Sequence, residues 1–271
     1  MPGLGRRHAR PNLGAFNQGA TPTIACVNAA KMGLGVDFPK LVAALQAYVD
    51  RFIAPVWGTP AKLVISTKLT GQQWGLVFLD DADVANALAY HDLTPAGFPL
   101  SKVFVRTTLR AGEAVSVSAS HELVEMLVDP AINLMTTGPD PRATYAYETA
   151  DPCEALAFPV LGIPMSDFVY PSYFEAFRPA GSVRFDAMGK VRKPFEILRG
   201  GYQIVFKGGR WSQVFGSATK GKAFQREDRR GHRSEQRKRV GKRGLERSAG
   251  GAVAISRRSS RGLPSRCSQA R

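Results

Sequence analysis

The stretch AVSVSASHELVEMLV, residues 114–128, places three ionisable side chains and three serines among apolar residues. It begins with a strand-like alternation and then takes helical spacing, and Asp129-Pro130 ends the run. We therefore predict a helix from about residue 117 to residue 129 that leaves few positions to face water. Burying its ionisable side chains costs several kcal/mol unless they find partners. Those side chains are His121, Glu122 and Glu125.

The spacing of these three side chains suits a metal ion. On a helix, His121 and Glu125 lie roughly 40° and about 6 Å apart, so an imidazole and a carboxylate share one face. Glu122 points about 100° around the helix from His121, where it can act on a water without being a ligand. This is the logic of the H-E-x-x-H zinc helix, with glutamate in place of the second histidine. A buried ion pair is the alternative interpretation.

A third ligand is expected from the acidic segment ETADPCE, residues 148–154. Asp151 is the first choice because Pro152 holds it in a turn. Glu148 and Glu154 are alternatives, either as ligands or as acceptors that orient His121. Histidine combined with carboxylates suits Zn²⁺, and Mn²⁺ or Fe²⁺ can occupy the same ligands.

Three further side chains are candidates for contact with a substrate or with a developing oxyanion. His91 lies in the segment AYHDLTP, where it can line a cleft or donate a hydrogen bond, although a local hydrogen bond within a loop is the commoner role. The hydroxyl groups of Tyr147 and Tyr170 are candidate oxyanion donors, and packing in strands is their ordinary alternative.

Three longer motifs carry a resemblance to a known family. SASHELVEMLVDP, YAYETADPCEA and IPMSDFVYPSYFEAF resemble a family of uncharacterised bacterial and phage-associated proteins near the zincin metallopeptidases, over residues 37–216. The resemblance implies an α+β, zincin-like fold with a mixed β-sheet and a metal-binding active-site helix. It also implies zinc on His121 and Glu125, with Asp151 or a neighbouring acid completing the shell and Glu122 as general base.

The resemblance therefore predicts a zinc-dependent hydrolase that acts on a peptide or protein substrate. The chain differs from most zincins in lacking the second histidine, and from the metzincins in lacking the glycine that turns the chain toward a third one. Two carboxylates leave an ion less electrophilic than histidines do, so slow hydrolysis is one expectation. A non-catalytic, metal-stabilised phage or assembly component is the alternative.

The positive charge of the chain is confined to its C-terminal quarter. Residues 207–271 hold 19 Lys and Arg against four acids, a balance of +15 that equals the formal net charge of the whole chain. Residues 1–206 are consequently neutral. We predict a flexible N-terminal arm at 1–36, a metal-binding domain at 37–216 and a disordered basic tail at 217–271. With few aromatic residues between its charges, the tail only weakly suggests binding to nucleic acid or an anionic surface.

The remaining patterns indicate a protein of the cytoplasm. Three scattered cysteines exclude a disulfide framework, and the sequence has neither the apolar core of a secretory signal nor a run long enough to cross a membrane. The sequence does not define an oligomeric state.

The expected elements are short. A helix is predicted after Asp37, ending at Pro55, and strands at 62–67, 74–80 and 102–107, with a short helix or long loop at 80–100. The runs YQIVF and PFEIL are also expected to be strands.

Overall fold

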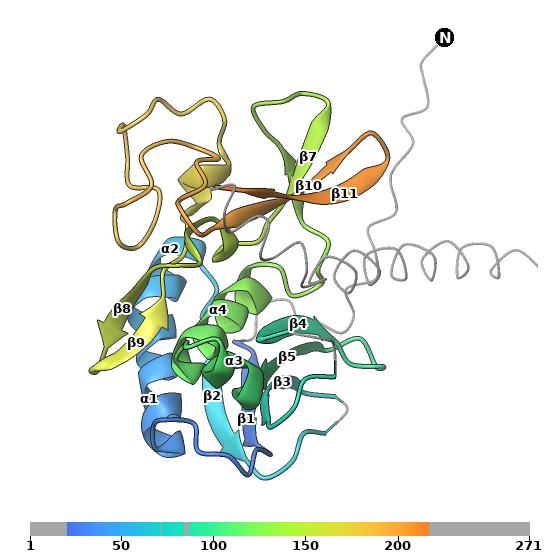
Figure 1. Cartoon of the computed structure of the whole chain (residues 1–271), viewed down its shortest axis with the longest axis vertical. Helices are drawn as coiled ribbons and strands as arrows, with labels where there is room; N and C mark the ends of the chain where they lie inside the picture. The colour runs from blue at the N-terminus through green and yellow to red at the C-terminus, as the bar shows by residue number, and fades with distance from the viewer. Residues whose placement is uncertain (1–20, 71, 84–86, 217–271) are drawn as a thin grey trace, which may run out of the picture.

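A mixed five-stranded sheet organises the first half of the computed structural model, which describes residues 21–70, 72–83 and 87–216 (Figure 1). The sheet has the order β2-β1-β3-β5-β4, in which β4 is antiparallel to β5 and the other neighbours are parallel. The α+β class and the mixed sheet are thus confirmed. The strands are β1 (Thr23–Asn28), β2 (Lys62–Ser66), β3 (Trp74–Leu79), β4 (Ala89–Leu93) and β5 (Pro99–Phe104).

Strand β1 corrects the expected boundary of the N-terminal arm. It lies between β2 and β3, and its residues Ile24 to Val27 are buried. The arm predicted for 1–36 therefore contains a core strand, and the folded part begins well before residue 37. A strand that is buried on both faces lacks the polar alternation by which strands are recognised. Residues 1–20 of that arm and the whole predicted tail, 217–271, lie outside the described residues.

The first helical segment begins as predicted and ends later. Helix α1 (Phe38–Tyr48) has Asp37 as its N-cap, whose Oδ1 accepts from the backbone N–H of Lys40 at 3.2 Å. The chain then continues through a π-helical turn, η1 (Val49–Ile53), and a short helix, α2 (Ala54–Trp57), before Gly58 ends it in a left-handed conformation. The wider π turn accommodates Pro55, which cannot donate a helical hydrogen bond.

Helix α4 (Val115–Val128) is longer than predicted, since the strand-like residues at its start are helical. Two serines in that part bind the hairpin of β8 (Ala157–Val160) and β9 (Ile163–Ser166). Ser116 Oγ donates to the carbonyl of Pro164 at 2.7 Å, and Ser120 Oγ accepts from the N–H of Ser166 at 2.8 Å. Ser116 and Ser120 therefore face the hairpin from a helix, and the alternation of serine with apolar residues does not indicate a strand.

The segment at 80–100 contains strand β4 in place of the expected helix or loop. It forms a hairpin with β5 in which His91 lies opposite Ser101. The strand predicted at 102–107 ends at Phe104, because the chain then enters α3 (Val105–Arg110).

The second half of the chain adds an antiparallel sheet of order β11-β10-β7-β6 at the other end of the molecule, with α4 between the two sheets (Figure 1). Its strands are β6 (Met135–Thr137), β7 (Ala143–Ala146), β10 (Tyr202–Lys207) and β11 (Arg210–Phe215). Two 3-10 turns, η2 (Asp151–Cys153) and η3 (Pro171–Phe174), lie between β7 and β10. The predicted strand PFEIL is irregular there, whereas YQIVF lies in β10.

The main hydrophobic core joins α1 and α4 to one face of the mixed sheet and to the β8–β9 hairpin. Leu41 and Leu45 of α1, Leu123 of α4 and Phe78 of β3 are fully buried in it. In the part of the chain that the structure describes, no helix has the length and apolar character needed to cross a bilayer.

Candidate metal centre

Helix α4 carries three of the predicted side chains, and all three are buried. The exposed fractions are 8% for His121, 3% for Glu122 and 0% for Glu125. The helix is fixed against the mixed sheet at this point because Ser101 Oγ on β5 donates to the carbonyl oxygen of Glu122 at 3.2 Å. Together with the serine contacts to the hairpin, this bond holds the polar turn of α4 from both sides.

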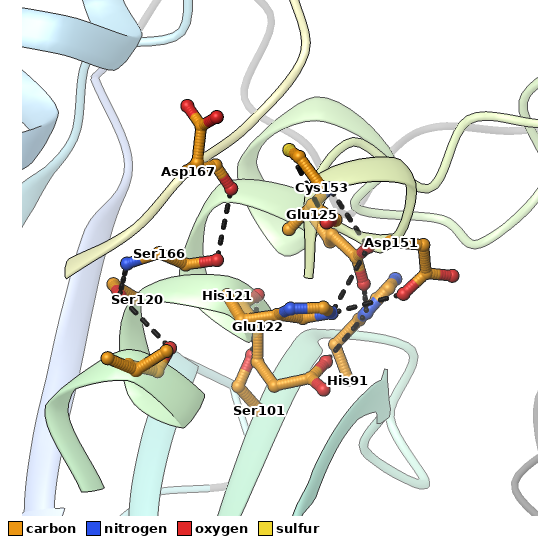
Figure 2. Close-up of polar contacts among 12 residues, drawn as sticks. His91, Ser101, Ser120, His121, Glu122, Glu125, Asp151, Cys153, Ser166 and Asp167 are labelled. Atoms are coloured by element: carbon orange, nitrogen blue, oxygen red, sulfur yellow. Dashed lines mark hydrogen bonds and ion pairs between the residues drawn. The ribbon is translucent and has the colours of Figure 1, made fainter. Parts of the chain in front are cut away.

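The first triad consists of His121, Glu125 and Asp151, the residues that the sequence selected as ligands (Figure 2). His121 Nε2 lies 3.4 Å from Glu125 Oε1 and 3.2 Å from Asp151 Oδ1. Asp151 opens the 3-10 turn η2, and the N–H of the preceding residue, Ala150, donates to Glu125 Oε1 at 3.3 Å. The turn that was expected from Pro152 thus places the Asp151 carboxylate beside His121 of helix α4.

The second triad consists of His91, Glu122 and Glu125. His91 lies on β4, is 1% exposed, and places Nδ1 3.2 Å from Glu122 Oε2 and 3.5 Å from Glu125 Oε2. The sequence suggested His91 only as a cleft-lining residue or donor. Its position beside two carboxylates of α4 depends on the pairing of β4 with β5, which places His91 across from Ser101.

The two triads concentrate negative charge in a buried space. Glu125 belongs to both, and Glu122 and Asp151 add a second carboxylate to each. Burial lowers the pKa of the His121 imidazole, but the neighbouring carboxylates, Glu125 foremost, outweigh burial and raise it to about 10. In the absence of a metal ion, the neighbouring carboxylates therefore favour the protonated form of His121. Such a group of carboxylates favours any bound cation.

The separations within the triads fit ligands around an ion. Hydrogen bonds between charged groups have lengths of about 2.7–2.9 Å. The contacts here are longer, 3.2–3.5 Å. Ligands arranged tetrahedrally at about 2.0–2.1 Å from zinc are separated by roughly 3.3 Å. Imidazole nitrogen and carboxylate oxygen are also ordinary zinc ligands, so the donor set and its spacing both suit the ion.

The other predicted residues lie outside the triads found among the described residues. Glu148 is buried and Glu154 half-buried, on either side of Asp151 in the chain. Tyr147 stacks on Phe174, with ring centroids 4.1 Å apart. Tyr170 packs against Phe168 at 5.8 Å. These two tyrosines thus contribute to aromatic packing, and their predicted role toward an oxyanion stays a prediction.

Comparisons of the chain with models of protein families, with curated proteins and with solved structures found no match.

Proposed function

We propose that the chain is a metal-dependent hydrolase in which His121, Glu125 and Asp151 hold a zinc ion and the substrate is a peptide or protein. The observation that carries the proposal is the convergence of one imidazole and two carboxylates, all buried, at separations of 3.2 and 3.4 Å around His121 Nε2. Mn²⁺ or Fe²⁺ fits the same ligands. A mixed sheet beside a buried HExxE helix supports the zincin-like interpretation of the fold.

In this proposal Glu122 moves the proton. A bound zinc ion supplies Lewis acidity, which lowers the pKa of water and polarises a carbonyl oxygen. The Glu122 carboxylate accepts the proton of the attacking water and returns it to the leaving amine as the C–N bond breaks. His91 Nδ1, 3.2 Å from Glu122 Oε2, holds that carboxylate in place. His91 contacts both Glu122 and Glu125, and it thereby connects the proposed base to a member of the first triad.

The place of β4 favours an extended peptide as the substrate. Among the described residues, β4 is the edge strand of the mixed sheet, and it carries His91 of the second triad. The outer edge of such a strand can pair with a peptide through main-chain hydrogen bonds. A peptide added there would run alongside the candidate metal centre.

The test is metal content together with hydrolysis, measured on the full chain. We expect tightly bound zinc that is lost in His121→Ala and in Asp151→Asn and is kept in Glu122→Gln. A mixture of unstructured peptides should be cleaved by the wild type, and about 10²- to 10⁴-fold more slowly by Glu122→Gln. If the wild type binds no zinc after reconstitution, the proposal is wrong.

The depth of the first triad favours a second candidate, a metal that only stabilises the fold. His121 is 8% exposed and the other two ligands are fully buried, which suits a closed structural shell. Zinc would then raise the midpoint of thermal unfolding, and no peptide would be cleaved. Glu122→Gln would show the same rise in the midpoint with zinc and the same lack of cleavage. This outcome corresponds to the non-catalytic phage or assembly component expected as the alternative. The basic tail at 217–271, with its weakly suggested nucleic-acid binding, stays a prediction.

A further inference from the structure

The second triad has the same chemistry as the first. One imidazole nitrogen, His91 Nδ1, lies 3.2 Å from Glu122 Oε2 and 3.5 Å from Glu125 Oε2. All three side chains are buried, and their ligand atoms lie within 4.8 Å of one another. The two separations from His91 Nδ1 again match the roughly 3.3 Å between ligands around a tetrahedral zinc ion.

His91 is also only partly satisfied by the residues around it. Its Nδ1 faces the two glutamates, whereas the Nε2 atom is buried without a hydrogen-bond partner in the described part of the chain. The ring is therefore oriented by its Nδ1 side alone. Burying a ring with one unpaired nitrogen costs free energy, and a cation shared by Nδ1 and the two carboxylates would offset part of that cost.

Glu125 connects the two triads through different oxygens. Its Oε1 faces His121 and the N–H of Ala150, and its Oε2 faces His91 (Figure 2). A carboxylate used in this way bridges two ions, and paired ions in proteins are about 3.5–4 Å apart. Through the two oxygens of Glu125, the two triads could hold two ions at once as two halves of one site.

The charges indicate that the two halves differ in affinity. Three carboxylates, those of Glu122, Glu125 and Asp151, carry a formal charge of −3 around the two positions. One divalent ion leaves this group at −1, and a second ion reverses it to +1. The second ion is thus attracted, but it binds more weakly because it shares Glu125 and is repelled by the first.

We propose that His91, Glu122 and Glu125 bind a second divalent cation, more weakly than the first triad does, and that this ion is inhibitory. The inhibition rests on the proposed function, because an ion bound to the Glu122 carboxylate prevents it from accepting the proton of water. High zinc concentrations would then switch off a chain that low zinc concentrations switch on.

The test is a titration of the full, metal-free chain with zinc, followed by calorimetry and by mass spectrometry of bound metal. We expect a tight step and a weaker step, one ion each. His91→Ala and Glu122→Gln, on different elements, should each keep the tight step. Both variants should weaken zinc binding at the weaker step by more than the roughly 10- to 100-fold that is typical when a residue supporting a metal ligand is lost. Asp151→Asn should remove the tight step, and excess zinc should no longer inhibit the residual hydrolysis of His91→Ala.

A matched control and three possible failures separate this inference from the proposed function. The control is Glu175→Gln, which should leave both steps unchanged because Glu175 pairs with Arg178 and lies outside both triads. A single ion that is lost in Asp151→Asn overturns the second site and leaves the first triad intact. A second step that persists in both His91→Ala and Glu122→Gln also overturns it. No zinc in the wild type overturns the proposed function as well.

Discussion

A single carboxylate, Glu125, is the side chain on which the candidate centre depends most. It contributes one oxygen toward His121 and the other toward His91, and it is fully buried. Replacing it would remove a candidate ligand from both triads, whereas replacing Asp151 would remove one from the first triad only. A substitution of Glu125 therefore tests whether the two triads share a ligand, because only a shared ligand would affect zinc binding at both.

We expect Glu125→Gln to weaken both zinc-binding steps by more than about 100-fold, because the neutral amide is a far poorer ligand than a carboxylate. Titration calorimetry of the full chain measures both steps. Glu175→Gln is the matched control, since Glu175 forms a surface ion pair with Arg178 and lies outside both triads. Wild-type affinity at either step in Glu125→Gln would show that Glu125 does not bind the ion at that step.

At the same scale, the sequence predicted the members of the first triad but not the partners of His91. His121 and Glu125 are one helical turn apart, so local periodicity places them together. The pairing of His91 with Glu122 instead requires the β4–β5 hairpin, which is a contact between distant parts of the chain. The turn residues between AYHDL and FPLSKVF, TPAG, were the signal that could have revealed this hairpin.

At the scale of elements, Asp151 is placed by the 3-10 turn η2. The backbone of η2 in turn packs closely against Gly201. A Cβ atom added at Gly201 would lie 2.2 Å from the carbonyl oxygen of Pro152 and 2.7 Å from that of Asp151. Both atoms belong to the backbone, so the turn must move to make room. A side chain at position 201 would therefore displace the turn that carries Asp151.

We expect Gly201→Ala to lower the stability of the fold by about 1–3 kcal/mol and to weaken the tight zinc step, because the displaced turn carries Asp151 away from His121. Chemical denaturation measures the first effect and zinc titration the second. Gly33→Ala is the control, since an added Cβ atom there meets no atom within 4 Å. Unchanged zinc affinity in a destabilised Gly201→Ala would mean that η2 does not position Asp151.

Prediction of the elements succeeded where local pattern and burial agree. Helix α1, with its Asp37 cap, and strands β2 and β3 follow from spacing and from turn residues. Strand β1 was missed because its burial on both faces removes the alternation, and the start of α4 was misread because buried serines imitate it. In each case tertiary contacts decided the structure.

On the scale of the whole molecule, a pair of buried acids holds a long irregular segment to the rest of the fold. Asp167 follows β9, and its Oδ1 accepts from the N–H of Met188 at 3.0 Å. Asp186 accepts from the N–H groups of Lys190 and Val191 at 2.9 and 3.1 Å. An isolated β-bridge joins Val169 to Asp186, so the two acids are held side by side. Burial, together with the hydrogen bond and charge of Asp186, raises the pKa of Asp167 to about 8.

This raised pKa predicts that the molecule loses stability as the pH rises. The carboxyl group of an unfolded aspartate has a pKa of about 3.9. Between pH 4 and pH 8 the folded chain therefore keeps on Asp167 a proton that the unfolded chain has released. The free energy of unfolding falls by up to about 1.4 kcal/mol per pH unit in this range and levels off above it. Below pH 4 both states are protonated, and the full stabilisation is present.

The measurement is denaturant unfolding of the wild type and of Asp167→Asn at several values between pH 5 and pH 8, under the same metal conditions. The amide keeps a donor for Asp186 but cannot ionise, so the variant should gain stability relative to the wild type as the pH rises. Asp50→Asn, at an exposed carboxylate, should follow the wild type at every pH. A constant difference between Asp167→Asn and the wild type would mean that Asp167 is ionised throughout, and that the buried pair is held by its backbone donors rather than by a shared proton.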